Sequence, residues 1–175
     1  MKKLLFLVAA AGLQLAIIGG LFARARMPLV VGEEIRVAVR PVDPRSLFRG
    51  NYAELTYDFG SLGPDLLDGI PQKMLGRGQV IYVQMEENDG LWEATGASLE
   101  QPEEGISLRG RTDHRRWWNG HLRVHYGIEA WFAAKHDAIA LEEQVRDRSV
   151  QTIAVLKVAP GGRVALADIE ARPRR

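Results

Sequence analysis

After residue 32, the chain alternates apolar and polar residues over short stretches, as half-buried strands do. The first stretch covers residues 35–39, and the prolines of PVDP (41–44) end it because proline donates no backbone hydrogen bond. The second stretch covers residues 52–59. Its predicted inward face carries Ala53, Leu55, Tyr57 and Phe59, and its outward face carries Tyr52, Glu54, Thr56 and Asp58.

Turn residues divide the remainder into further predicted strands. QVIYVQM and LWEAT flank an Asp-Gly pair at Asp89, which is a strong hairpin signal. The other predicted strands are ISLRGR (106–111), the alternating residues 122–130, TIAVLKV (152–158) and RVALADIE (163–170), the last two joined by APGG. A single helical turn is expected around Asp65, and good helix formers predict a helix at 134–147.

About seven short strands separated by turns predict a mainly antiparallel β domain. The sequence leaves open whether this domain is a sandwich or a partly open barrel. The helix at 134–147 is expected to cover an edge or an end of the sheet.

The first residues follow a different pattern. Leu4 to Ala23 is a run of 20 residues without a charge, long enough as a helix to cross the roughly 30 Å apolar layer of a membrane. We expect residues 1–26 to be an uncleaved anchor and residues 27–175 to be an extracytoplasmic domain at the bacterial inner membrane. Pro28 is expected to end the helix, so that residues 24–32 form a connector.

Two alternatives accompany the anchor. Ala23-Arg24-Ala25 has the small-x-small form of a signal-peptide cleavage site, although the apolar run is longer than usual for a signal. Gly12, Ala16 and Gly20 form a stripe of small residues that permits helix self-association, although such residues are common in spanning helices. Either form of the leader carries the remaining chain out of the cytoplasm.

Charge and composition exclude several kinds of chemistry. Without Lys2 and Lys3, the chain keeps 21 of its 23 basic residues against 22 acidic ones, so it has no composition for binding nucleic acid. The absence of cysteine excludes disulfides and thiolate catalysis. His121 and His125 lie on a predicted strand about 13 Å apart, which is too far to share one metal ion. We expect no metal, no cofactor and no catalytic residue.

The polar segment RTDHRRWWNGH (111–121) is predicted to be a loop between strands. Basic and aromatic side chains together favour contact with a membrane surface, because tryptophan prefers the interface and arginine attracts anionic lipid. The predicted contact residues are Arg115, Arg116, Trp117 and Trp118. The alternative is a solvated hairpin loop whose tryptophans fold back onto the core.

Two motifs resemble those of a known family. The stretch 39–57 (VRPVDPRSLFRGNYAELTY) is similar to the defining signature of the GDYXXLXY family, and LRVHYGIEAWF (122–132) resembles its Tyr-Gly-Ile-Glu strand. The resemblance implies an N-terminal membrane segment and an extracytoplasmic domain, without an established activity. It also implies a membrane complex with a polytopic membrane protein as partner. Asn51 departs from the signature's aspartate, and Lys135 stands where an acid is usual.

The candidate binding residues come from these two motifs. Tyr57 is expected to pack inward with its hydroxyl group satisfied, Tyr52 to face a partner, and Glu129 to point outward and pair with Arg45 or Arg49. The full set is Arg45, Arg49, Asn51, Tyr52, Tyr57, Tyr126 and Glu129. The alternative function is a signal-peptidase-like Ser/Lys membrane peptidase, but Ser46 lacks the sequence context of that nucleophile.

Overall fold

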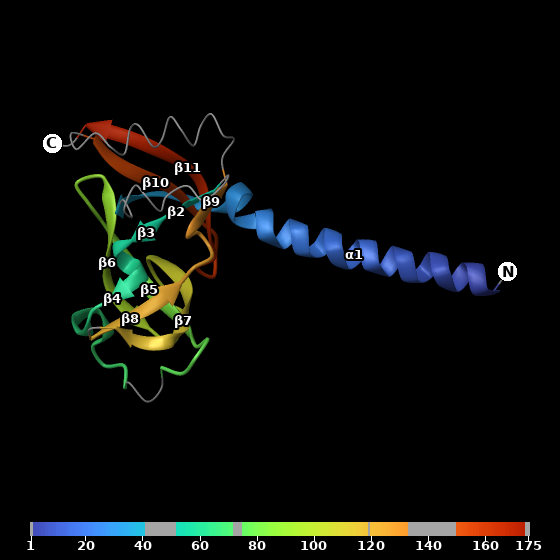
Figure 1. Cartoon of the computed structure of the whole chain (residues 1–175), viewed down its shortest axis with the longest axis horizontal. Coiled ribbons are helices and arrows are strands. Elements are labelled where there is room, and N and C mark those ends of the chain that lie inside the picture. The colour runs from blue at the N-terminus through green and yellow to red at the C-terminus, as the bar shows by residue number, and fades with distance from the viewer. Residues whose placement is uncertain (1, 41–51, 72–74, 119, 133–149, 174–175) are drawn as a thin grey trace.

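The computed structural model describes residues 2–40, 52–71, 75–118, 120–132 and 150–173. They form a long helix, α1 (Lys2–Val31), that runs directly into a β domain (Figure 1). The strands are β1 (Glu33–Arg40), β2 (Tyr52–Glu54), β3 (Thr56–Tyr57), β4 (Ser61–Leu62), β5 (Val80–Asn88), β6 (Leu91–Ser98), β7 (Ile106–Trp118), β8 (His121–His125), β9 (Ala130–Phe132), β10 (Val150–Val158) and β11 (Val164–Pro173). Two short 3₁₀ helices are η1 (Asp58–Gly60) and η2 (Pro64–Leu67). The helix predicted at 134–147 lies outside the described residues.

All strand pairs between these elements are antiparallel, as predicted. One sheet has the order β11-β10-β1-β3, a second has the order β4-β8-β7-β5-β6, and β2 pairs with β9. Figure 1 shows β10 and β11 at one end of the domain and β4, β7 and β8 at the other. The mainly antiparallel β fold is therefore confirmed.

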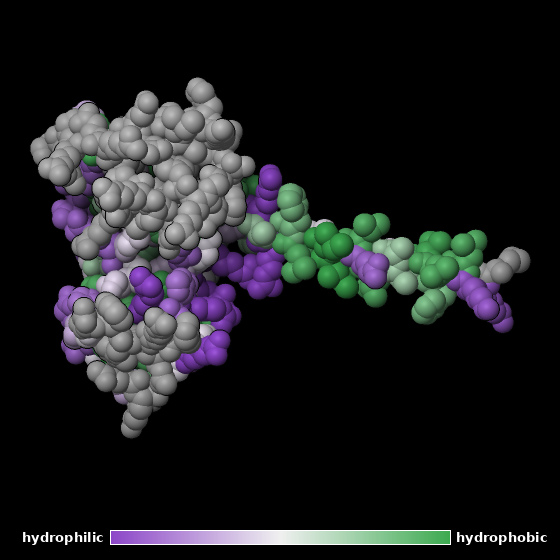
Figure 2. Space-filling model, viewed as in Figure 1, coloured by the Kyte–Doolittle hydropathy of each residue, from purple (hydrophilic) through white to green (hydrophobic). Residues whose placement is uncertain are grey.

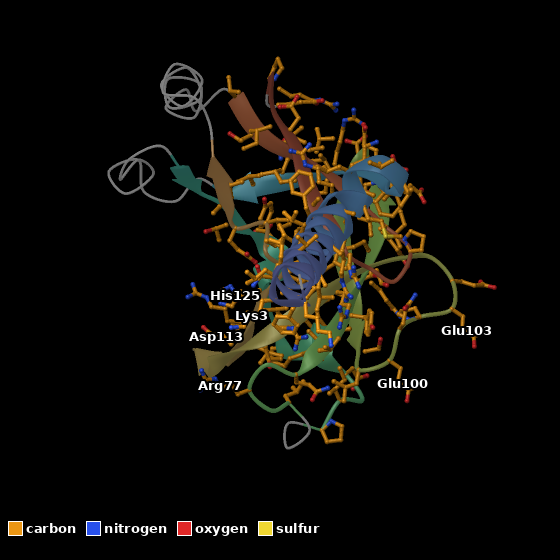
Figure 3. The ribbon with its side chains drawn as sticks, turned by 90° about the vertical axis from the view of Figure 1, so that its right-hand side faces the viewer. Lys3, Arg77, Glu100, Glu103, Asp113 and His125 are labelled. Atoms are coloured by element: carbon orange, nitrogen blue, oxygen red, sulfur yellow. The ribbon has the colours of Figure 1, made fainter. Side chains whose placement is uncertain are left out.

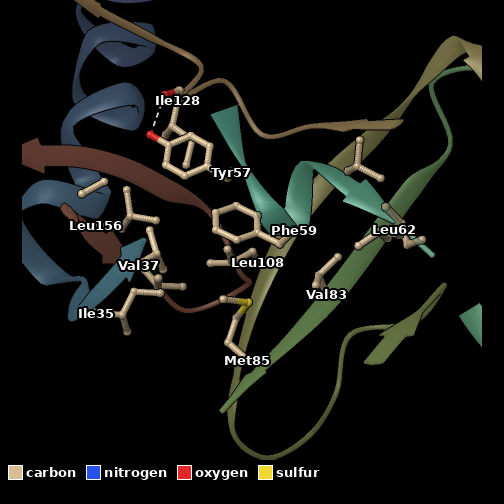
Figure 4. Packing of buried hydrophobic residues seen from close by; sticks show 14 of the residues in the cluster. Ile35, Val37, Tyr57, Phe59, Leu62, Val83, Met85, Leu108, Ile128 and Leu156 are labelled. Carbon is tan, nitrogen blue, oxygen red and sulfur yellow. Dashed lines mark hydrogen bonds between the residues drawn. The ribbon is translucent and has the colours of Figure 1, made fainter. Parts of the chain in front are cut away.

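Both sheets contribute to one hydrophobic core (Figure 4). Ile35 and Leu156 of the first sheet and Val83, Leu108 and Leu122 of the second are each at most 1% exposed. Burying a side chain of this size stabilises the fold by about 1.5–3 kcal/mol. The alternation at residues 35–39 therefore predicts correctly that one face of β1 is buried in this core.

The strand predicted at 52–59 is divided between two sheets. β2 pairs with β9, whereas β3 pairs with β1, so the chain changes partner at Leu55. A turn of η1 then follows where the prediction continued the strand. The inward face nevertheless holds, because Leu55, Tyr57 and Phe59 are all at most 4% exposed.

The strand predicted at 122–130 is also interrupted. β8 ends at His125, and Gly127 has a φ of 84°, a left-handed conformation that favours glycine. The turn shifts the alternation, so Ile128 is buried as predicted but Ala130 is exposed, which contradicts its predicted inward position.

Two hairpin predictions are confirmed and one loop prediction is wrong. Asp89 and Gly90 have φ values of 51° and 80°, as a tight turn between β5 and β6 requires, and β10 and β11 form the second hairpin. The segment predicted as a loop after residue 111 is instead the second half of β7. Its pairing with β8 shifts register between Thr112 and Trp117, and this irregularity hides the strand from period-2 analysis.

The helix does not end at Pro28. Proline has no N–H to donate to the carbonyl of Arg24, yet the chain remains helical to Val31. Pro28 is buried against the domain, and its carbonyl accepts a hydrogen bond from the Gly32 N–H at 2.9 Å. The predicted connector is therefore wrong, because Gly32 alone separates α1 from β1.

Gly32 also lies close against the backbone of β10. A Cβ atom at this position would lie 2.9 Å from the Val158 backbone nitrogen and would overlap the Pro28 carbonyl oxygen. Only glycine fits without a shift of backbone. The end of α1 is consequently packed onto β10 and β11 rather than hinged to them.

Candidate functional site

The two motifs singled out in the sequence lie side by side. β2, which contains the Tyr-Ala-Glu part of the first motif, pairs with β9, so that Tyr52 is opposite Phe132. Immediately after β2, the Leu55 N–H donates a 2.7 Å hydrogen bond to the carbonyl oxygen of Glu129. Residues more than 70 positions apart are thus joined through the backbone.

Two tyrosine hydroxyl groups reinforce this junction in opposite directions. The Tyr57 hydroxyl donates to the Ile128 carbonyl oxygen at 3.0 Å, drawn as the dashed line in Figure 4. The Tyr126 hydroxyl donates to the Phe59 carbonyl oxygen at 2.8 Å. Each motif therefore supplies a donor that satisfies a carbonyl of the other.

The rings of these residues pack as a group of three. Tyr57 stacks on Phe59 with ring centroids 5.0 Å apart and planes inclined by 18°. Phe59 meets Tyr126 edge to face at 5.1 Å and 81°. Such pairs add about 0.5–1.5 kcal/mol each beyond their burial. The expected inward packing of Tyr57 is confirmed, whereas its role in binding a partner stays a prediction.

The environment keeps both hydroxyl groups neutral. Burial raises the pKa of Tyr57 and of Tyr126 well above the usual range of tyrosine, and the nearby Glu129 carboxylate raises each pKa further. At neutral pH the two groups are hydrogen-bond donors. Their role here is to hold the backbone carbonyls of Ile128 and Phe59 in position through hydrogen bonds.

Glu129 closes the turn that follows β8. Its Oε1 accepts a hydrogen bond from the Tyr126 N–H at 2.6 Å, and its Oε2 accepts one from the Gly127 N–H at 2.9 Å. The side chain therefore bends back to its own turn instead of pointing away. His125 lies at the edge of this group, with Nδ1 3.9 Å from Glu129 Oε1.

Several predicted site residues fall outside the described part of the chain. These are Arg45, Arg49 and Asn51, together with Ser46 of the peptidase alternative and the side chain of Tyr52. The predicted pairing of Arg45 or Arg49 with Glu129 stays a prediction. His121 and His125 both lie on β8, as their strand interpretation requires.

The predicted membrane-contact residues lie at the far end of β7. Trp117 and Trp118 pair with the first residues of β8, whereas Arg111 pairs with the last residue, His125. The side chains of Arg115, Arg116, Trp117 and Trp118 are outside the described part, so their membrane contact also stays a prediction.

Sequence reasoning missed a basic cleft where the helix meets the domain. It has a volume of about 440 Å³ and lies between α1, β7, the turn after β8 and the start of β11. Four arginines line it, namely Arg24, Arg109, Arg111 and Arg163. No local signal predicts this cleft, because these residues are spread over 140 positions of the chain.

Comparison with known proteins places the chain in a family. No curated protein and no solved structure matches it. A family model described as "GDYXXLXY protein" matches residues 14–169, from within α1 to within β11. The chain therefore belongs to the GDYXXLXY family.

Proposed function

We propose that this protein is a single-pass membrane protein of the bacterial envelope. Its β domain lies outside the cytoplasm and acts as a binding or assembly subunit for a polytopic membrane protein. The observation that carries the proposal is the junction at Gly32, which fixes the domain to the helix without a linker. A domain held in this way presents one constant face to a neighbour in the same membrane.

The surface of the helix supports this proposal. Among the described residues, α1 is the one helix long and apolar enough to cross a membrane. None of the residues in its most apolar stretch is buried against the rest of the protein. Figure 2 shows hydrophobic residues along its length, with side chains such as Leu15 and Phe6 at least 70% exposed. This surface requires lipid or another membrane helix around it.

The structural contacts of the residues in the two family motifs also support a binding or assembly role. Tyr57 and Tyr126 direct their hydroxyl groups into the domain, and Glu129 binds backbone N–H groups. These side chains stabilise a rigid body, and a rigid body suits an assembly role.

Sidedness is tested with two fusions to the C-terminus. If the domain is extracytoplasmic, the alkaline phosphatase fusion should be active, because this enzyme becomes active only after export. The green fluorescent protein fusion should not fluoresce, because this protein folds to its fluorescent form in the cytoplasm. Deletion of residues 1–26 is the control and should reverse both signals. Fluorescence from the full-length fusion would contradict the proposed location.

The partner is tested by photo-crosslinking in intact membranes. A crosslinking amino acid at Leu13 or Ile17, both exposed on the helix, should capture a polytopic membrane protein. The same group at Arg172, next to the last residue of β11, is the matched control, since Figure 1 shows β11 ending on the side of the domain away from the helix. Capture of lipid alone at both helix positions would contradict the assembly role. Labelling by a serine-reactive probe that Ser46→Ala abolishes would support the peptidase instead.

A further inference from the structure

We infer that the basic cleft between α1 and the β domain binds the phosphate of an anionic phospholipid headgroup. The inference rests on the proposed function only in requiring that α1 spans a membrane. It concerns arginines, at positions 24, 109, 111 and 163, that belong neither to the two family motifs nor to the predicted membrane-contact residues.

Three of the four arginines of the cleft have no acidic partner among the described residues. None of the ion pairs among the described residues includes the guanidinium groups of Arg24, Arg109 or Arg163. Four cations that line one cleft repel one another, and an anion in the cleft relieves this repulsion. Guanidinium groups suit phosphate because their planar forks donate two parallel hydrogen bonds.

The nearby acids are already engaged. Asp113 Oδ2 lies 3.5 Å from Nε2 of His125, and Glu129 accepts two backbone hydrogen bonds. Figure 3 shows His125 and Asp113 together on one side of the helix, seen along its length. Among the described residues, neither carboxylate forms an ion pair with Arg24, Arg109 or Arg163.

Backbone contacts hold the cleft walls in place. The Arg109 N–H donates to the Gly162 carbonyl at 2.7 Å, which clamps the β10–β11 turn onto β7 and sets Arg163 near Arg109. Gly162 has a φ of 76°, and a Cβ there would lie 2.8 Å from the Ser107 carbonyl oxygen. On the same strand, Arg111 Nη1 donates to the Gly78 carbonyl at 3.0 Å.

The base of the cleft is apolar. The Tyr126 ring lies over Gly110, where a Cβ would come within 2.9 Å of the ring carbon Cε1 and would overlap Val124. Because glycine occupies this position, the ring lies against the strand. A cleft with cationic walls and an aromatic base matches a headgroup phosphate joined to glycerol carbons.

The position of the cleft along α1 sets its depth in a membrane. The apolar run ends at Ala23, and Arg24, the next residue, lines the cleft. The guanidinium of Arg26 lies 4.8 Å from the centroid of the Phe22 ring, so this charge reaches back toward the apolar run. The cleft therefore opens at the level where phosphates of a bilayer lie. The volume of about 440 Å³ is within the roughly 300–1,000 Å³ usual for small-molecule sites.

The experiment measures lipid binding by the full chain in mild neutral detergent. Short-chain phosphatidylglycerol is titrated against the wild type, Arg109→Gln/Arg163→Gln, and the control Arg77→Gln/Arg123→Gln. The control removes equal charge from exposed positions outside the cleft. Each basic residue near anionic lipid contributes about fivefold in affinity, so the cleft variant should bind about 25-fold more weakly. The control should bind like the wild type.

Further arms identify the source of the phosphate. Phosphatidylcholine should bind at least about tenfold more weakly than phosphatidylglycerol, because its choline is repelled by the arginines. Soluble glycerol phosphate should bind more weakly still, since it lacks the acyl chains. Equal binding by glycerol phosphate, or unchanged binding by the cleft variant, would overturn the inference.

Two measurements separate this result from the proposed function. Equal melting temperatures of the lipid-free variants show that each is folded, and the intact mass of the purified chain shows whether Arg24 is still present. A chain cleaved after Ala25 lacks Arg24 and refutes the anchor. An intact, folded chain without preference for phosphatidylglycerol refutes only the lipid site.

Discussion

The hydroxyl group of Tyr57 and the carbonyl oxygen of Ile128 are joined by a buried 3.0 Å hydrogen bond across 71 residues of sequence. The bond links the last tyrosine of the Tyr-x-x-Leu-x-Tyr segment to the residue that precedes Glu129. Tyr126 makes the converse bond to Phe59. Together these bonds explain why tyrosine rather than phenylalanine suits both positions.

We expect Tyr57→Phe to destabilise the domain by about 1–2 kcal/mol, because the buried Ile128 carbonyl would lose its donor. Tyr82→Phe is the matched control, since the Tyr82 hydroxyl has no hydrogen bond with the described residues. Its effect should be within about 0.5 kcal/mol. Chemical denaturation of the full chain in detergent measures both. Equal stability of the two variants would contradict the proposed role of the bond.

Stability should fall at alkaline pH because of the same tyrosines. The folded-state pKa of Tyr57 and Tyr126 is raised above the unfolded value near 10. Their contribution is fully present below pH 10 and is lost as the pH rises from there toward the folded-state pKa. Together they give a slope of about 2.7 kcal/mol per pH unit over that range. Melting temperatures from pH 8 to 12 should fall less for Tyr57→Phe/Tyr126→Phe than for the wild type.

Glu129→Gln should cost about 1–3 kcal/mol, because an amide has one acceptor oxygen where the carboxylate receives two backbone N–H groups. Glu93→Gln, on the exposed face of β6, is the control. Thermal unfolding compares the two.

The same assay distinguishes the turn from the predicted ion pair. If Glu129 acts only through its own turn, Arg45→Gln and Arg49→Gln should leave the melting temperature unchanged. A loss in either arginine variant that disappears when it is combined with Glu129→Gln would establish the predicted pairing.

Gly32→Ala should separate the end of α1 from β10, because the added methyl group meets the Pro28 carbonyl and the Val158 nitrogen. The expected cost is about 1–3 kcal/mol. Gly76→Ala is the control, since a Cβ there meets no atom within 4 Å. Spin-label distances between helix and domain should broaden in the first variant only. An unchanged distribution would mean that the junction tolerates the methyl group.

Sequence periodicity predicted the structural features that are determined by residues close together in the chain. The inward faces of β1 and of Leu55, Tyr57 and Phe59 follow from alternation, and the Asp89-Gly90 turn follows from backbone preference. The change of sheet at Leu55 does not alter alternation, so the 52–59 stretch was predicted as one strand. Pro28 by itself predicts an end of the helix, whereas α1 continues past it to Val31, with Pro28 buried.

The candidate site was predictable only as two motifs. Their contact was a hypothesis that rested on a pairing of Arg45 or Arg49 with Glu129. The carboxylate of Glu129 instead binds its own turn, a local geometry that alternation does not contain. The basic cleft depends on tertiary structure throughout, because Arg24 and Arg163 come from opposite ends of the chain.

Gly32 also has a mechanical consequence. With one residue between helix and strand, a tilt of α1 in the proposed membrane arrangement would carry the sheet with it. Bilayers of different thickness change the tilt of spanning helices. The domain would thus convert membrane thickness into the direction in which its surface faces.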